Sequence, residues 1–131
     1  MATELKVMIV DDDALIRLTV REVLKDAGIG VVEADGAGQC LEHLKQGFRG
    51  VVLMDIMMPG RDGWDTIREI IKGDLYKGII IVMLTAKDIP DSKMEGLQEY
   101  VTDYKTKPFT QDELVSDIKD YFVYLEKMDN E

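Results

Sequence analysis

Several features that define other classes of protein are scarce or missing in this chain of 131 residues. Cysteine occurs once, at Cys40, which rules out an internal disulfide and a metal site built from several thiolates. No apolar run approaches the roughly 20 residues that span a bilayer, and the N-terminus lacks the pattern of a signal peptide. Internal repeats, low-complexity segments and interdomain linkers are also missing. We therefore expect one cytoplasmic domain over residues 1–131, with its core from about 5 to 126.

Basic residues are also scarce, with 16 Lys and Arg against 26 Asp and Glu, for a formal net charge of −10. Repulsion from nucleic-acid phosphates opposes contact with such a surface, so we expect no direct binding of nucleic acid. Most of these acidic residues suit a solubilising surface. A close cluster of them would need a cation, because neighbouring carboxylates repel one another when all are ionised.

The sequence does contain a buried-strand pattern that ends in an aspartate. Four apolar residues at 51–54 run directly into Asp55, and a Met-Pro-Gly turn follows at 58–60. A continuous apolar run bounded by turn residues is typical of a strand covered on both faces of a parallel sheet. Open α/β sheets place their sites at the carboxyl edge, so Asp55 is the first candidate for chemistry.

The other apolar patterns alternate between strand and helix periods. Further strands are predicted at 6–10, 30–34, 79–84 and 104–106, the last as an edge strand because of the charged Lys105. Helices are predicted at about 15–27, 39–45, 64–72 and 91–100, and after a capping box at 110–113, with fraying from about Met128. Five strands alternating with five helices predict a parallel sheet with helices on both faces.

Such a sheet brings the polar residues at its strand ends to one edge. They are Asp11, Asp12, Asp55, Thr85 and Lys107. Mg²⁺ suits this set, because it is bound through one or two carboxylates, waters and phosphate oxygens. A carboxylate can act as a nucleophile and form an aspartyl phosphate, and an ammonium and a hydroxyl group can stabilise the charge on the transferred group.

The exact register of the first acidic residues is open by one position. Three consecutive aspartates occupy 11–13, and Asp13 is equally suited to cap the helix that follows.

Four motifs, in order, carry a resemblance to a known family. They lie at residues 10–12, 53–63, 83–86 and 107–109. With this order and spacing the chain, from Lys6 to about Leu125, closely resembles the receiver domain of two-component response regulators. The resemblance implies a flavodoxin-like, doubly wound (βα)5 three-layer sandwich with a five-stranded parallel sheet of order 2-1-3-4-5.

The same resemblance implies a phosphorylation switch that catalyses only its own phosphorylation and dephosphorylation. Asp55 would accept a phosphoryl group from the phosphohistidine of a sensor histidine kinase or phosphotransfer protein. Asp12 would ligate Mg²⁺ directly and Asp11 would help through water. The Asp55 carboxylate and the backbone carbonyl of Met57 would complete the metal site.

Further roles are implied for the last two strands. Lys107 would pair with the phosphoryl oxygens, Thr85 would move inward to hydrogen-bond them, and the ring of Tyr104 would turn inward with it. The Lys107–Pro108 bond matches one that is usually cis in the family, which X-Pro energetics allow. The changed surface would be read by a downstream protein or output domain.

Two other classes of function stay open. A pure interaction module would keep the fold without being phosphorylated. Failure to bind Mg²⁺ would favour it, whereas the presence together of Asp11, Asp12, Asp55, Thr85 and Lys107 argues against it. A Mg²⁺-dependent phosphatase acting through a phosphoaspartate would want an acid or base two positions after the nucleophile, where this chain has Met57. His43, the only histidine, is interpreted as a surface residue outside the site.

Overall fold

The computed structural model describes residues 5–85 and 96–129. Five parallel strands form one sheet in the order β2-β1-β3-β4-β5, so the predicted α/β fold and strand order are confirmed. The strands are β1 (Lys6–Val10), β2 (Val31–Ala34), β3 (Gly50–Asp55), β4 (Ile79–Thr85) and β5 (Asp103–Thr106). The helices are α1 (Ala14–Asp26), α2 (Ala37–Lys45), α3 (Gly63–Lys72), the 3₁₀ turn η2 (Gln98–Tyr100) and α4 (Gln111–Asp129).

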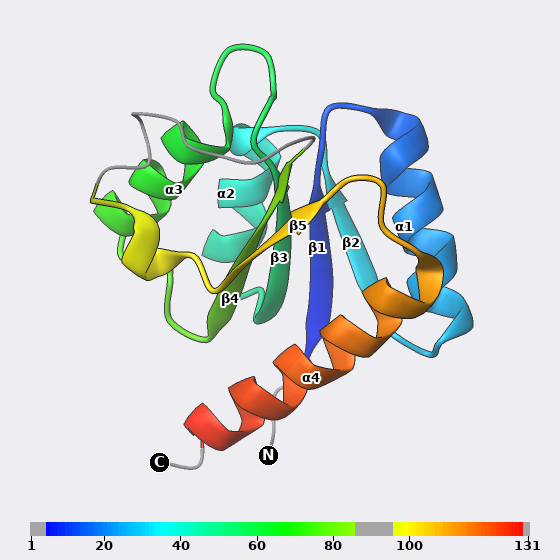
Figure 1. Cartoon of the computed structure of the whole chain (residues 1–131). Helices are drawn as coiled ribbons and strands as arrows, with labels where there is room; N and C mark the ends of the chain where they lie inside the picture. Colours follow the sequence, from blue (N-terminus) through cyan, green and yellow to red (C-terminus); the bar gives the residue numbers. More distant parts are fainter. Residues whose placement is uncertain (1–4, 86–95, 130–131) are drawn as a thin grey trace.

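The helices form a layer on each face of the sheet. Helices α2 and α3 cover one face, and α1 and α4 cover the other (Figure 1). Successive residues of a strand point to opposite faces; Met8 and Val10 therefore join the core beneath Trp64, while Val7 and Ile9 pack towards α1 and α4. Within the described ranges, no helix combines the length and apolar character needed to cross a membrane.

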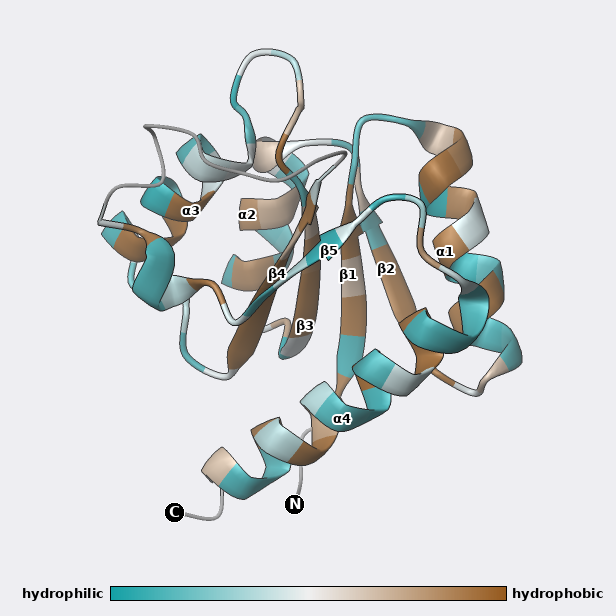
Figure 2. Ribbon diagram, viewed as in Figure 1, coloured by the Kyte–Doolittle hydropathy of each residue, from teal (hydrophilic) through white to brown (hydrophobic). Residues whose placement is uncertain are grey.

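The buried strands are the apolar ones, as the sequence predicts. All six residues of β3 are buried, and β4 lies inside the sheet between β3 and β5 (Figure 2). The short strand β5 forms one edge of the sheet and is largely exposed, apart from a half-buried Lys105. The ammonium of Lys105 pairs with Asp117 of α4, which accounts for a charged residue facing a helix.

The strand register places all carboxyl ends together. Val10 is paired with Met54, and Asp55 is paired with Leu84. Thr85 is paired with Thr106, which immediately precedes Lys107. The ends of β1, β3, β4 and β5 therefore face one region of the molecule.

Two predicted helices differ from the structure, and a third agrees closely at its end. Helix α2 begins at Ala37, two residues before the predicted start, behind a Gly36 that makes no side-chain cap. Helix α4 continues to Asp129, close to the predicted start of fraying at about Met128, and residues 130 and 131 lie outside the described residues. The predicted helix at 91–100 lies outside the described residues up to 95. Its last part forms only the turn η2, after Gly96 at a left-handed φ of +82°.

Candidate functional site

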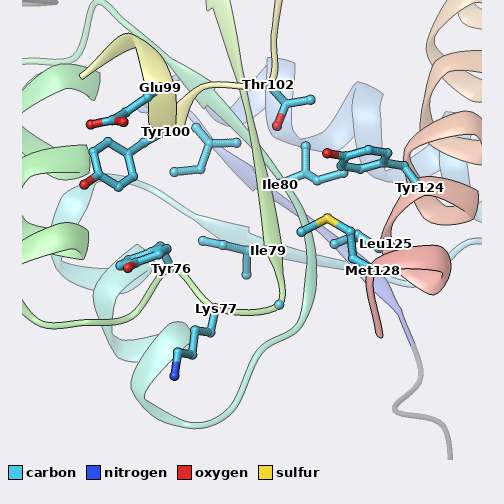
Figure 3. A pocket seen from close by; sticks show the side chains of 12 residues that line it. Tyr76, Lys77, Ile79, Ile80, Glu99, Tyr100, Thr102, Tyr124, Leu125 and Met128 are labelled. Atoms are coloured by element: carbon cyan, nitrogen blue, oxygen red, sulfur yellow. The ribbon is translucent and has the colours of Figure 1, made fainter. Parts of the chain in front are cut away.

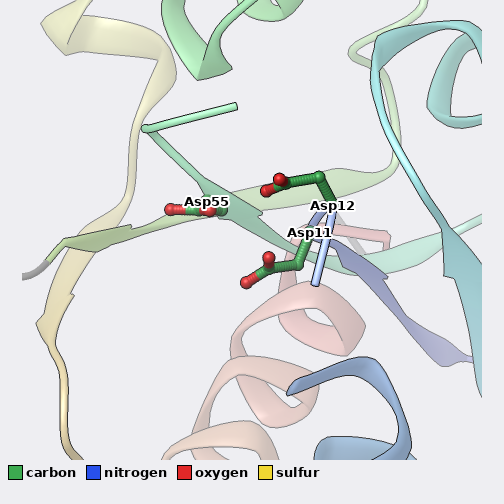
Figure 4. Close-up of side chains that lie close together, drawn as sticks. All are labelled: Asp11, Asp12 and Asp55. Atoms are coloured by element: carbon green, nitrogen blue, oxygen red, sulfur yellow. The ribbon is translucent and has the colours of Figure 1, made fainter. Parts of the chain in front are cut away.

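Three carboxylates meet at the carboxyl edge of the sheet. Asp11 and Asp12 follow β1 and Asp55 ends β3, and one oxygen from each lies within 4.8 Å of the other two (Figure 4). Asp11 and Asp55 are buried, whereas Asp12 is exposed. The cluster is therefore closed by the sheet on one side and open to solvent on the other.

The turn after β1 resolves the register of the three aspartates. The Asp13 N–H donates to Asp11 Oδ1 at 2.9 Å, and the Leu15 N–H donates to Asp13 Oδ1 at 2.9 Å. Asp13 is thus the N-cap of α1, and Asp11 and Asp12 are the members of the cluster.

Lys107 supplies the positive charge at this edge. Its Nζ lies 3.2 Å from Asp11 Oδ2 and 3.5 Å from Asp55 Oδ1. Its backbone N–H donates to the carbonyl of Thr85 at 2.7 Å, and its bond to Pro108 is cis, the isomer that the resemblance implied. One ammonium therefore serves two of the three carboxylates.

Asp55 lies in an environment that opposes its ionisation. Burial raises the pKa of Asp55 above its ordinary value, and the neighbouring Asp11 charge raises it further. The Lys107 ammonium and a 3.2 Å hydrogen bond from the Met57 N–H to Asp55 Oδ1 lower this pKa in part. A cation beside Asp55 would therefore stabilise its charged form.

A tight loop after β3 holds Asp55 at the rim. The Gly63 N–H donates to the Ile56 carbonyl at 2.9 Å, and a Cβ on Gly63 would lie only 2.8 Å from the Asp55 carbonyl oxygen. Asp62 and Asp65 form a reciprocal capping box that begins α3 directly behind this contact. Gly63 is therefore required at this position, because a side chain would collide with the backbone of Asp55.

Thr85 and Tyr104 lie on the two strands beside Asp55. Thr85 ends β4, one residue after the Leu84 that pairs with Asp55. Tyr104 lies on β5 with 37% of its surface exposed, and burial raises the pKa of its hydroxyl. Its ring contacts the ring of Trp64, with centroids 6.4 Å apart.

Reasoning from the sequence missed two residues at the site, Arg17 and Glu33. Arg17 Nη1 donates to the Asp11 carbonyl at 2.6 Å, and Arg17 Nε donates to Glu33 Oε1 at 3.3 Å. A charged residue inside the short apolar strand β2 was the available signal. His43 is half-buried, with Nε2 2.9 Å from the Glu33 carbonyl, so its interpretation as a surface residue was only partly right.

A separate pocket of about 460 Å³ lies at the amino end of β4. Tyr76 and Tyr100 line one side of it, and Tyr124, Leu125 and Met128 line the other (Figure 3). None of the clustered carboxylates reaches this pocket. The carboxyl edge therefore remains the candidate for chemistry.

Comparisons with known proteins agree with this geometry. Residues 7–119 match the family model of the response regulator receiver domain. Protein PilG of Pseudomonas aeruginosa is 35% identical over 115 residues, which cover 88% of this chain and 85% of PilG. The phosphate regulon transcriptional regulatory protein PhoB of the same species is 37% identical over 113 residues, 86% of this chain and 49% of PhoB. The chain thus spans about half the length of the PhoB relatives that it matches.

Two solved structures are similar over nearly their whole length. A CheY-like response regulator receiver domain protein from Methanospirillum hungatei has a TM-score of 0.90 and 54% identity, covering 95% of this chain and 99% of that one. Chemotaxis protein CheY4 of Vibrio cholerae has a TM-score of 0.80 and 29% identity, and the match covers 91% of this chain and 99% of CheY4.

Proposed function

Because the chain belongs to the response regulator receiver domain family, we propose that Asp55 accepts a phosphoryl group from a phosphohistidine on a partner protein. The observation that carries this proposal is the Lys107 ammonium, paired with both Asp11 and Asp55 beside the third carboxylate of Asp12. Membership makes the chain a signalling phosphoacceptor rather than an enzyme that turns over free substrates, and it implies a histidine kinase as partner.

The transfer needs a nucleophilic oxygen with a free lone pair. Asp55 Oδ1 is engaged by the Met57 N–H and by Lys107, whereas Oδ2 accepts no hydrogen bond within the described residues. Oδ2 is therefore the attacking atom of the proposal. Its bond to phosphorus forms as the P–N bond of the donor imidazole breaks, and the departing imidazole takes up a proton. The product is an acyl phosphate on Asp55.

The donor set fits Mg²⁺, a hard ion that prefers oxygen ligands. Three carboxylates share one ammonium here, so the described cluster carries an excess of negative charge. Asp12 is the proposed direct ligand and Asp11 the ligand through water, with Asp55 and the Met57 carbonyl completing the set. When bound, Mg²⁺ supplies charge neutralisation for the transferred phosphoryl group.

The proposed switch runs from Thr85 to Tyr104. Thr85 lies at the end of β4 beside the Asp55 strand, and Tyr104 lies on the next strand against Trp64. Movement of the Thr85 hydroxyl towards the phosphoryl group would leave space that the Tyr104 ring fills. The surface around β5 and η2 would change, and a downstream protein or output domain would read that change.

A hollow beside the site suits the docking of the phosphodonor. It measures about 510 Å³ and lies between α1 and the segment after β5, with Leu15, Ile16 and Phe109 in its lining. Leu15 is 69% exposed, and Lys107 lines this hollow as well as the acidic site. We propose that the histidine-bearing partner packs apolar side chains here, which brings its phosphohistidine to Asp55.

We also propose that residues 1–131 form a single receiver domain that acts in the cytoplasm. The family match over residues 7–119 supports a single receiver domain over 1–131 with its core at about 5–126. A net charge of −10 supports a domain that does not bind nucleic acid directly. A cytoplasmic location fits a chain with one cysteine, which is buried.

The test is phosphorylation by acetyl phosphate, with and without Mg²⁺, followed by intact mass. We expect one added phosphoryl group that needs both Mg²⁺ and Asp55. Asp55→Asn should abolish the adduct. Asp13→Asn is the matched control, because it makes the same chemical change at the N-cap outside the cluster, where asparagine caps equally well. An adduct that survives in Asp55→Asn, or that forms equally well in a chelator, would contradict the proposal.

A further inference from the structure

Asp12 is held in the acidic cluster by its backbone rather than by its side chain. Its carboxylate is exposed and forms no hydrogen bond or ion pair within residues 5–85 and 96–129. Both peptide groups that flank its Cα are hydrogen-bonded. The Asp11 carbonyl accepts from Arg17 Nη1 at 2.6 Å, and the Asp13 N–H donates to Asp11 Oδ1 at 2.9 Å. Two fixed peptide planes determine φ and ψ between them, and hence the direction in which the Asp12 side chain leaves the chain.

Arg17 is itself held from the neighbouring strand. Its Nε lies 3.3 Å from Glu33 Oε1 on β2, and only 17% of its side chain is exposed. Arg21 Nη1 donates at 2.8 Å to the other oxygen, Glu33 Oε2, so the contact of Arg17 with Oε1 does not depend on Arg21. A planar guanidinium can donate in two directions at once, here to a strand side chain and to the carbonyl of the β1–α1 turn.

We propose that Arg17 is a positioning residue for the cation site, orienting Asp12 through the Asp11–Asp12 peptide, and that Glu33 keeps Arg17 in place. The inference rests on the proposed function, because it concerns the same metal site. Arg17 acts through Asp12 and is not itself a ligand.

Positioning and simple electrostatics predict opposite effects on Mg²⁺ affinity. A guanidinium near a cation site repels the cation, so removing it would tighten binding if its charge alone mattered. Removing a group that orients a metal ligand weakens binding, by about tenfold at the lower end of the usual range. The direction of the change therefore separates the two explanations.

The chain offers a matched control variant. Arg17→Met keeps the apolar stem and removes the donors, and we expect its Mg²⁺ affinity to fall about tenfold. Arg21→Met makes the same change against the same Glu33 but leaves the Asp11 carbonyl bonded, so its affinity should stay within about twofold of the wild type. The Mg²⁺ affinity of Glu33→Gln should lie between those of Arg17→Met and Arg21→Met. The affinity of Arg17→Lys should resemble that of Arg17→Met, because an ammonium cannot donate in two fixed directions as a guanidinium does.

Two measurements test the inference. Titration calorimetry with MgCl₂ at constant ionic strength gives the affinities, and ¹⁵N relaxation of the metal-free protein gives the order parameter of the Asp12 amide, which should fall in Arg17→Met. If the wild type binds Mg²⁺, two results would overturn the positioning role of Arg17 but leave the proposed metal site standing. They are an unchanged order parameter of the Asp12 amide in Arg17→Met, and tighter Mg²⁺ binding by that variant. A wild type that binds no Mg²⁺ would overturn the proposed site and this inference together. Circular dichroism checks that each variant is folded.

Discussion

The rings of Trp64 and Tyr104 lie with their centroids 6.4 Å apart and their planes inclined at 48°. Trp64 is completely buried beneath the sheet, and its Nε1 has no hydrogen-bond partner within the described residues. Tyr104 is 37% exposed on the edge strand. The only tryptophan of the chain thus contacts the residue whose ring we propose to move.

Phosphorylation of Asp55 should therefore change the fluorescence of Trp64. Inward rotation of the Tyr104 ring would alter the packing and polarity around the indole. Emission measured with acetyl phosphate and Mg²⁺ should change in the wild type and stay constant in Asp55→Asn. Tyr104→Leu should lose most of the change. Tyr76→Leu should keep it, because the Tyr76 ring contacts Tyr100 instead of Trp64.

Asp55→Asn should stabilise the metal-free protein. Burial and the Asp11 charge both oppose ionisation of Asp55, whereas asparagine keeps an acceptor for the Met57 N–H. We expect a gain of about 1 kcal/mol, or roughly 4 °C in Tm, in calorimetry with a chelator. Mg²⁺ should stabilise the wild type more than the variant, in proportion to its binding. Asp13→Ala provides the contrast, since losing the α1 cap should cost about 1 kcal/mol. A lower Tm for Asp55→Asn under these conditions would show that the ionised Asp55 carboxylate does not destabilise the folded protein.

Lys107→Met should tighten Mg²⁺ binding and weaken the switch. The Lys107 ammonium contacts Asp11 and Asp55, so it competes with a cation for the same carboxylates. Its removal should raise the Mg²⁺ affinity about tenfold, opposite in sign to Arg17→Met. The fluorescence response to phosphorylation should fall, because the ammonium would no longer pair with the phosphoryl oxygens. Lys119→Met is the control, as it removes the same charge from an exposed position on α4. Equal Mg²⁺ affinities in the wild type, Lys107→Met and Lys119→Met would mean that Lys107 does not compete with the cation.

The parts of the site that lie at strand ends could be predicted from the sequence. The apolar run before Asp55 and the turn after it mark a buried parallel strand, and parallel strands share one carboxyl edge. Asp11, Asp12 and Lys107 were assigned to that edge on the same basis, and the structure brings them together there. Strand pattern and topology are enough for this part because both follow from periodicity.

Contacts between separate elements could not be predicted in the same way. Arg17 and Glu33 are 16 positions apart and belong to a helix and a strand whose side chains meet only after folding. The early start of α2 was missed because Gly36 carries no side chain that could signal a cap. Asp13 was ambiguous because a cap and a metal ligand require the same residue type.

Cys40 should be unreactive in the native protein. It is fully buried on α2, and burial raises the pKa of its thiol to about 12. Iodoacetamide at pH 9 should label the native chain only as fast as it unfolds, whereas urea should expose the thiol to rapid labelling. A raised folded pKa favours the native state below the ordinary thiol value of 9.0, and this contribution is lost as pH rises from there towards about 12. Cys40→Ala should remove that part of the alkaline loss of stability. Rapid labelling without denaturant would contradict the burial.

Gly50→Ala should be among the most destabilising changes of a single methyl group in this chain. Gly50 begins β3 at a φ of +138°, and a Cβ there would lie 1.9 Å from the backbone oxygen of Lys6 on β1. Backbone cannot move aside within a paired sheet, so we expect a loss of roughly 3 kcal/mol or more. Gly60→Ala measures the cost of a positive φ without a steric clash, because Gly60 has a φ of +77° but open space around its Cβ position. It should cost only about 1–2 kcal/mol. Urea unfolding of both variants measures the difference, and equal costs would show that β1 and β3 can separate at this end without breaking the sheet.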